Sequence, residues 1–190
     1  MLNKLLMAAV TTVAMSSAAS ALTITNRTAD CELGSGTSVT CGTDDRRDLS
    51  VVELGESVGN DFFSLGLGGT AEFEIAPNFT GPLTALEVTN GRERYYTETA
   101  DVFGRNTSTG MFELLGSVSN TSAVSTINFA GSFDAIRFTD TTIVPGNRTG
   151  DGYDLAAFTV AAVPLPAGGL LLIGGLGALG VASRRRRKAA

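Results

Sequence analysis

The sequence predicts an all-β protein, an antiparallel β-sandwich of jelly-roll-like form, on three observations. In the middle of the chain, apolar and polar residues alternate with period two in several short segments, as in strands with one buried face. Clusters of Gly, Asn and Pro separate these segments and mark turns. Outside the two termini, no segment of useful length has the period of an amphipathic helix.

The clearest expected strand covers residues 71–75, where Ala, Phe and Ile alternate with two glutamates. A second alternation places Glu87 on the solvent face, between the apolar residues Leu86 and Val88. The same pattern, with the apolar residues expected in the core, recurs at 112–114, 127–129 and 136–138. Turn signals lie between these segments, at 76–78, 89–91, 105–107 and 145–147.

The N-terminus has the three zones of a cleaved secretory signal. Lys4 supplies a positive charge, and residues 5–14 form an apolar stretch that is too short to span a bilayer. Ala19 and Ala21 are small residues at the positions that a signal peptidase requires. We therefore expect a signal helix within residues 1–21, cleavage after Ala21, and an exported protein.

The C-terminus also has three parts. A motif with two prolines leads into residues 165–182, which carry no charge and are long enough for a transmembrane helix. A basic cluster follows, and the positive-inside rule keeps it in the cytoplasm. The cluster consists of Arg184, Arg185, Arg186, Arg187 and Lys188. Residues 22 to about 162 would then lie outside the inner membrane.

The proline-containing motif is Val163-Pro164-Leu165-Pro166-Ala167. With the apolar helix and the Arg run, it resembles the VPLPA variant of the PEP-CTERM sorting signal. That resemblance implies processing by a membrane-embedded exosortase in a Gram-negative bacterium that makes extracellular polysaccharide. The partners it implies are the inner membrane as a transient anchor, the exosortase-type enzyme and extracellular polysaccharide, with the cell envelope or extracellular matrix as destination. A permanent membrane anchor is the alternative.

The chain is expected to contain one folded domain. We assign residues 1–21 to the signal, 22–50 to a Cys-containing segment, 51–162 to the β-sandwich and 163–190 to the sorting tail. Cys31 and Cys41 are the only cysteines. Because an exported protein meets an oxidising compartment, they are expected to form a local disulfide.

The exported part is strongly acidic. It holds all 19 Asp and Glu residues but only eight of the 14 basic ones, a formal charge of about −11, and the chain has no histidine. This charge argues against nucleic acid as a partner. It is compatible with a solvated acidic surface or with cation binding, and the sequence does not separate the two.

A second resemblance covers roughly residues 58–160. The segments that carry it are SLGLGG (64–69), AEFEI (71–75), ETADV (98–102), FELLG (112–116), IRFTD (136–140) and DGYDL (151–155). Together they resemble the galactose-binding-like jelly rolls of the discoidin type. Such domains bind sugars, lipids or calcium through loops at one end, or act only as scaffolds. The resemblance transfers no ligand residue to this chain.

Enzyme chemistry finds little support in the residue types present. Without histidine, neither a Ser-His-Asp nor a Cys-His arrangement is possible, and the expected disulfide would remove the cysteine nucleophile. A pair of carboxylates could in principle hydrolyse a glycoside, but the sequence singles out no pair. We therefore predict that the chain is not an enzyme and needs no cofactor, with calcium as the one candidate ion.

Two weak candidate sites remain. Asp140, Asp151 and Asp154 lie around a Gly-rich turn, and calcium takes several oxygen ligands from such loops. The alternative is that these residues shape the turn and the start of a strand. Arg92, Arg94, Tyr95 and Tyr96 could contact a sugar, although neighbours in a strand point to opposite faces.

The sequence thus favours a non-enzymatic, exported β-sandwich protein, targeted to the envelope or matrix by its tail. The alternative is a secreted module that binds glycan or calcium, and the third possibility is an extracellular hydrolase. The destination of the protein is predicted more firmly than its activity.

Overall fold

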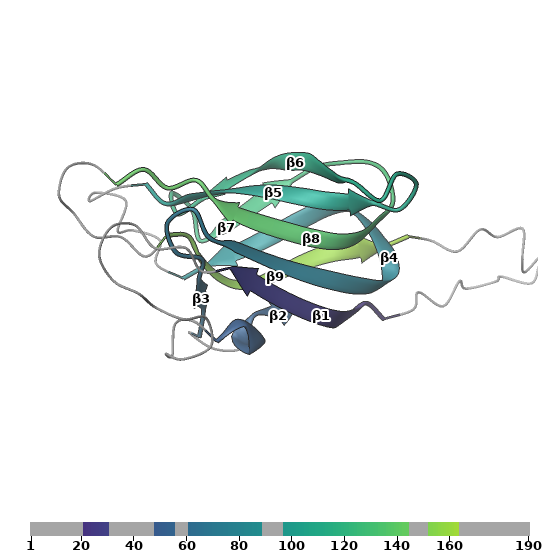
Figure 1. Ribbon diagram of the computed structural model, residues 1–190, viewed down its shortest axis with the longest axis horizontal. Helices are drawn as coiled ribbons and strands as arrows, with labels where there is room; N and C mark the ends of the chain where they lie inside the picture. Colours follow the sequence, from purple (N-terminus) through teal and green to yellow (C-terminus); the bar gives the residue numbers. More distant parts are fainter. Residues whose placement is uncertain (1–20, 31–47, 56–60, 89–96, 145–151, 164–190) are drawn as a thin grey trace, which may run out of the picture. The chain divides into compact units, whose positions relative to one another are not determined.

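The computed structural model describes residues 21–30, 48–55, 61–88, 97–144 and 152–163. All of them belong to one unit, Ser20–Val163. Within these ranges the only helix is η1, a short 3-10 turn at Leu49–Val51. A search of the same residues for an apolar helix of membrane-spanning length finds none. Every other element is a strand, so the described part of the chain is all-β, as predicted (Figure 1).

The strands of the described residues are β1 (Thr23–Asp30), β2 (Glu53–Leu54), β3 (Phe63–Ser64), β4 (Thr70–Glu87), β5 (Thr99–Asn106), β6 (Phe112–Ser119), β7 (Val124–Ile127), β8 (Phe133–Asp140) and β9 (Asp154–Ala162). β1 belongs to the same sheet as the strands after residue 51, because it pairs antiparallel with β4. The sheet therefore includes part of the segment 22–50. The expected signal and transmembrane helices lie outside the described residues.

The long strand β4 connects two layers of the sheet. Residues 70–79 pair with β1 and β8, whereas residues 79–87 pair with β9 and β7. The ladders with β8 and β9 both shift register in the stretch between these two parts. This stretch contains Pro77 and Pro82, which have no N–H to donate to a ladder. It is therefore suited to a bend at which a strand passes from one layer to the other.

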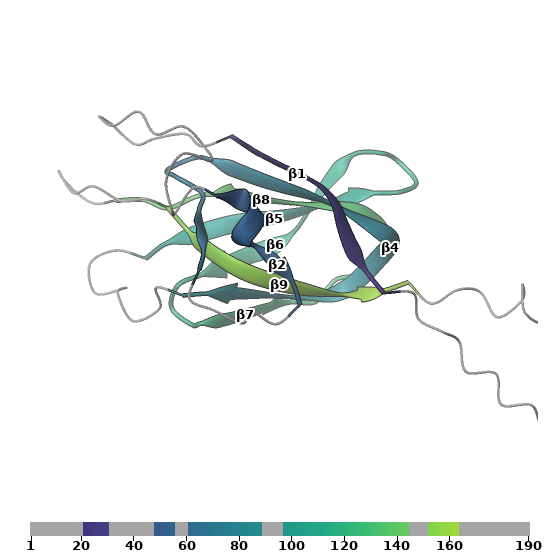
Figure 2. The same cartoon turned by 90° about the horizontal axis from the view of Figure 1, so that it is seen from below.

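The first layer has the strand order β1-β4-β8-β5-β6, and all its pairs are antiparallel. The second layer is β7-β4-β9, and the short strands β2 and β3 also pair with β9. Figure 1 shows β8, β5 and β6 side by side, and Figure 2 shows β2, β9 and β7 from below. The domain is thus a β-sandwich.

Two groups of phenylalanine side chains form much of the core between the layers. In one group the ring centroids lie 5.0–6.3 Å apart, and in the other 5.3–6.5 Å. Aromatic pairs at such distances add about 0.5–1.5 kcal/mol to the effect of burial. The first group is Phe73, Phe138 and Phe158, and the second is Phe79, Phe129 and Phe133.

The strand predicted at 71–75 is confirmed, and its three apolar residues are buried in β4. The prediction that Glu87 faces solvent is wrong, because it is 3% exposed. Leu83 and Ala85 face the core, so the strand period also turns Glu87 inward. The inward prediction for Leu114 is wrong as well. It is 58% exposed on the edge strand β6, whose ladder with β5 shifts register nearby.

The two ends of the sandwich differ in composition. At the apolar end, defined by the bend of β4 with Phe79, Phe129 and Phe133, both termini of the described domain are close together. Thr23 pairs there with Ala76, and the Val163 N–H donates to the Asn78 carbonyl at 3.1 Å. The carboxylate end lies at the opposite ends of the same strands, roughly 25 Å away along β9.

Candidate functional site

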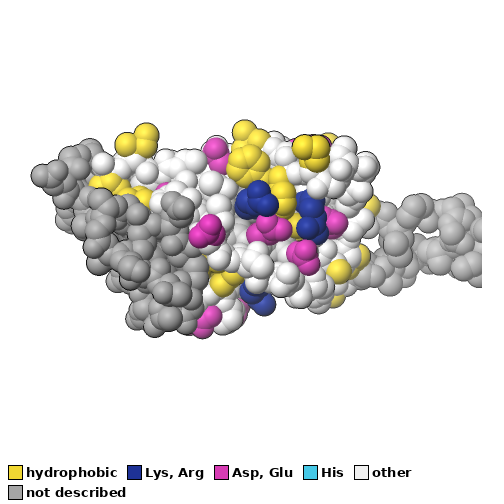
Figure 3. All heavy atoms as spheres, in the orientation of Figure 1, with side chains coloured by type: hydrophobic (Ala, Val, Ile, Leu, Met, Phe, Trp, Pro, Cys, Tyr) yellow, Lys and Arg dark blue, Asp and Glu magenta, His cyan; other side chains and the backbone are white. Residues whose placement is uncertain are grey.

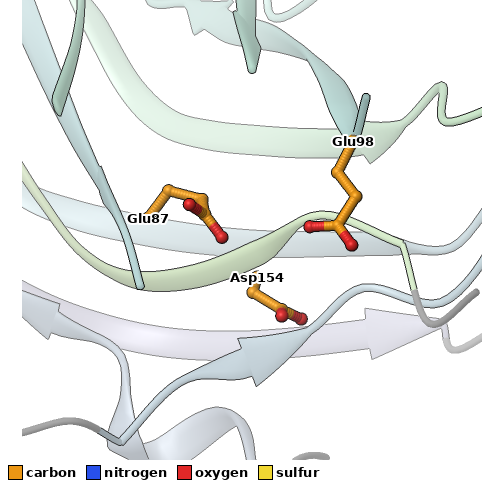
Figure 4. A group of neighbouring side chains, drawn as sticks. All are labelled: Glu87, Glu98 and Asp154. Carbon is orange, nitrogen blue, oxygen red and sulfur yellow. The ribbon is translucent and has the colours of Figure 1, made fainter. Parts of the chain in front are cut away.

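Three buried carboxylates meet at the carboxylate end of the sandwich. They belong to Glu87, the last residue of β4, to Glu98, just before β5, and to Asp154, the first residue of β9. One oxygen of each lies within 4.8 Å of one oxygen of each of the others. The residues are only 2–4% exposed. Figure 4 shows the three side chains, which come from three separate segments of the chain. We call this group the carboxylate triad.

Hydrogen bonds to Asn120, the residue after β6, fix the position of the Glu98 backbone. The Glu98 N–H donates to Oδ1 of Asn120 at 3.1 Å, and the Asn120 N–H donates to the Glu98 carbonyl at 3.0 Å. Asn120 is completely buried. This reciprocal pair closes the start of β5 onto the end of β6, so the Glu98 side chain enters the domain at a defined position.

The second layer holds the other two carboxylates. Glu87 pairs with Leu155 in the β4–β9 ladder, and its N–H donates to the Ala123 carbonyl at 2.9 Å. The Ser64 hydroxyl, from β3, donates a hydrogen bond to Oδ1 of Asp154. Glu87 and Asp154 therefore come from neighbouring strands of one layer, while Glu98 belongs to the other.

Tyr153 directly precedes Asp154, and its hydroxyl group lies close enough to the triad for the charges of all three carboxylates to act on it. Its side chain is fully buried, and the hydroxyl oxygen has no hydrogen-bond partner among the described residues. Burial, and then the charges of all three carboxylates, raise the pKa of this phenol far above its usual range. The hydroxyl is therefore neutral at physiological pH. A buried polar oxygen without a protein partner is costly, so this hydroxyl oxygen is suited to binding an ion.

Asp140 positions the segment that carries Tyr153 and Asp154. Its Oδ1 accepts from the Tyr153 N–H at 2.8 Å and from the Thr142 hydroxyl at 2.6 Å. Its Oδ2 accepts from the N–H groups of Gly68 and Thr142 at 3.0 and 3.2 Å. Next to this network, Gly152 has φ +79°, and a Cβ there would lie 2.6 Å from a backbone oxygen. Only glycine fits that position comfortably.

Of the three aspartates predicted as a calcium site, only Asp154 belongs to the triad. Asp140 belongs to the hydrogen-bond network just described, and Asp151 lies outside the described residues. The sequence did not identify Glu87, Glu98 or Tyr153 as site residues. A usable signal was present for the two glutamates, because they flank the predicted turn at 89–91 and so mark the facing ends of two strands.

Most of the remaining predicted site residues also lie outside the described ranges. Ala21 is exposed at the start of the described domain, and Val163 is at its end. Those outside the described ranges are Ala19, Cys31, Cys41, the cluster 92–96, the motif residues 164–167 and the basic cluster 184–188.

A shallow groove crosses the outer face of the first layer. It is lined by residues of β1, β4 and β8, namely Thr28, Ala29, Asp30, Thr70, Glu72, Arg137 and Thr139. Arg137 donates to Oε2 of Glu72 at 2.9 Å and stacks on the Phe112 ring at 3.7 Å from its centroid. Figure 3 shows positive and negative side chains interleaved on this face. The groove is open and polar, unlike the buried triad.

Neither a protein-family model nor a curated protein matches the chain. Several solved structures are similar to it. A CBM32 domain from Clostridium perfringens, solved with GlcNAc-α-1,4-galactose, is 14% identical over 73% of this chain and 89% of its own, with a TM-score of 0.47. The family 32 carbohydrate-binding module of Streptococcus pneumoniae EndoD is 15% identical over 78% and 100%, with a TM-score of 0.43.

A fucosidase from Ruminococcus gnavus is also similar, at 14% identity and a TM-score of 0.44. The chain spans 22% of the length of that enzyme. Carbohydrate-binding modules thus recur among the similar structures.

Proposed function

We propose that this chain is an exported, non-catalytic β-sandwich module that binds one divalent cation, calcium, at the carboxylate triad. The observation that carries the proposal is the meeting of three buried carboxylates beside a buried hydroxyl group that has no partner among the described residues. Three ionised carboxylates so close together repel one another, and positive charge between them offsets that repulsion. A cation at the triad supplies that charge, and the nearby Tyr153 oxygen is a further neutral oxygen ligand that we propose for it.

The geometry favours calcium among the common cations. Calcium lies about 2.3–2.6 Å from its oxygen ligands, so two ligands of one ion are at most about 5 Å apart. Oxygens within 4.8 Å of one another can therefore share one calcium ion. Magnesium requires a near-ideal octahedron and keeps several waters, which a buried group accommodates poorly. Zinc sites usually include His or Cys, and no histidine is present.

We propose that the chain is not a catalyst because the three triad carboxylates are buried. A glycoside hydrolase places two carboxyl groups on either side of a bound sugar ring, so its cleft must admit the substrate. The triad is only 2–4% exposed. Its carboxylates are therefore better suited to enclosing an ion than to contacting a substrate.

Export and sorting are the second part of the proposal. They rest on the signal-like zones before Leu22 and on the motif, apolar stretch and basic cluster of the tail. We expect the mature protein to begin at Leu22 and to lose the tail after processing near 163–167, before it reaches the envelope or matrix. The intact mass of protein isolated from the envelope measures both ends. A mass that retains Arg184–Arg187 would instead support the permanent anchor.

Terbium luminescence tests the cation site. Terbium binds calcium sites and luminesces when a neighbouring aromatic ring is excited, and this chain has no Trp and only three Tyr. Titrating terbium into the full chain in detergent should give sensitised emission. Calcium should displace the terbium and so remove this emission, whereas the same concentration of magnesium should not. Tyr153→Phe should abolish the emission, and Asp154→Asn should abolish binding.

Asp134→Asn, which removes a half-exposed carboxylate elsewhere, is the matched control and should leave the terbium signal unchanged. The proposal is wrong if no sensitised emission develops, or if Asp134→Asn and Asp154→Asn weaken it equally. It is also wrong if magnesium displaces terbium as readily as calcium does.

Glycan binding at the outer groove is a second candidate function. The groove offers three threonine hydroxyls beside the Arg137–Glu72 ion pair, and these groups can donate to and accept from sugar hydroxyls. Retention in affinity electrophoresis on extracellular polysaccharide tests it. Arg137→Ala should reduce retention several-fold, whereas Arg27→Ala, a loss of equal charge on β1, should not. Equal retention of all three proteins excludes the groove.

A further inference from the structure

The carboxylate triad spans the two layers of the sandwich. Glu98 precedes β5 in the first layer, whereas Glu87 and Asp154 lie on β4 and β9 in the second. Each hydrogen bond that positions a triad residue comes from the same layer as that residue. Asn120, which bonds to the Glu98 backbone, follows β6 of the first layer, and Ser64, which bonds to Asp154, is in β3 of the second. An ion at the triad therefore touches both layers.

At the apolar end the layers are already joined by the chain and by apolar packing. β4 itself passes from one layer to the other there, and Phe79 pairs with Phe133 of β8 and with Ala162 of β9. The rings of Phe79, Phe129 and Phe133 fill the space beside this bend. Neither the strand crossing nor the apolar packing depends on an ion.

At the carboxylate end, the charges of the two layers oppose closure. Glu98 faces the carboxylates of Glu87 and Asp154 inside the domain, where water screens charge poorly. When the three carboxylates are ionised and no cation is bound, this repulsion favours moving β5 away from β9. With a cation, each carboxylate is attracted to the same ion, and the layers are drawn together.

We propose that calcium at the triad acts as a clamp between the two layers, so that closure of the carboxylate end depends on calcium while the apolar end stays closed without it. This inference rests on the proposed calcium site and adds its consequence for the domain. The triad is then a control point for one end of the sandwich rather than a uniform stabiliser of the whole domain.

Hydrogen exchange on the full chain, with calcium or with equal magnesium at constant ionic strength, tests the clamp. The reporters are amides whose bonds hold the carboxylate end, namely those of Leu65, Glu87, Asn120 and Tyr153. If opening releases the ion, their exchange slows by the factor 1 + [L]/Kd, about tenfold at ten times Kd. Amides at the apolar end, such as those of Asn106 and Val163, should change less than about twofold, since no ion is released there.

The variant Glu98→Gln tests whether a change in the first layer alters calcium-dependent exchange in the second layer. It alters only the first layer, yet a clamp requires that it abolish the calcium-dependent slowing at Leu65 and Tyr153 in the second layer. The variant's folding is checked by its apolar-end exchange in the absence of calcium, and Glu87→Gln serves as the reciprocal variant if Glu98→Gln fails that check.

The outcomes separate the clamp from the site itself. If the unmodified chain does not bind terbium, both the calcium site and the clamp are wrong. Terbium binding with calcium-dependent slowing confined to one layer, or equal at both ends, would leave the site standing and overturn the clamp. Slowing at the carboxylate end of both layers, lost in Glu98→Gln, supports the clamp.

Discussion

The two ends of this sandwich close by different physical means. At the apolar end, buried phenylalanines and a strand shared by both layers hold the layers together, and burial of apolar surface stabilises them without any ion. At the carboxylate end, three acidic side chains occupy positions that would otherwise belong to the core. An inward-facing position on a strand therefore does not by itself require an apolar side chain. Ala85 and Glu87 are inward neighbours on β4, yet Ala85 packs in the core and Glu87 contributes a carboxyl group to the triad.

The largest effect is expected at the apolar end. Phe133→Ala should lower the free energy of unfolding by about 3–5 kcal/mol, because it leaves a cavity among Phe79 and Phe129. The loss should be the same with calcium and with chelator. Urea unfolding of the variant under both conditions measures it. A loss that changes with calcium would show that the two ends are coupled.

The next effect is the removal of calcium from the unmodified chain. A ligand at a hundred times its Kd stabilises the folded state by about 2.7 kcal/mol. For a domain of this size, that corresponds to roughly 8–10 °C in Tm. Thermal unfolding with calcium, with magnesium and with chelator measures the shift. Equal Tm values with the two ions would contradict a calcium site, because only screening would then be acting.

A matched pair of aspartates sharpens the contrast within the carboxylate end. Asp140→Asn weakens a network of four hydrogen bonds and should cost about 1–3 kcal/mol with or without calcium. Asp154→Asn removes one of three repelling charges, so it should cost less in chelator but lose the calcium-dependent stabilisation. Chemical unfolding of both variants in both conditions tests this. The reverse pattern would assign the ion to Asp140.

These differences explain how far the sequence could predict the structure. Alternation at 71–75 predicted a strand and its buried face, because side-chain period and burial are local properties. The sequence predicted Glu87 on the solvent face because its neighbours Leu86 and Val88 are apolar, and this alternation indicates that Leu86 and Val88 are buried. The inward phase is set by Leu83 and Ala85, after the bend of β4, and this bend depends on pairing with distant strands.

The candidate site was harder to predict than the fold. The sequence identified Asp154 from its Gly-rich turn but grouped it with nearby acids, since spacing along the chain was the only guide. The structure joins it to Glu87 and Glu98, which lie 67 and 56 residues earlier. Contacts of this kind depend on strand order, which no local pattern in one sequence specifies.

The smallest effect is expected on the outer face of the first layer, beside the apolar end. Arg105 donates to Asp134 at 2.7 Å and to Glu74 at 3.3 Å, and the hydrogen bond to Asp134 is the main cause that raises the pKa of Arg105. These side chains are 27–38% exposed, so solvent and salt screen them. A double-mutant cycle with Arg105→Ala and Asp134→Ala should give a coupling energy of about 0.2–1 kcal/mol that falls as salt is added. The same cycle in calcium and in chelator should give equal values, because the triad lies elsewhere in the domain. A coupling above about 2 kcal/mol, well beyond the range of exposed pairs, would show that this face contributes to closing the layers.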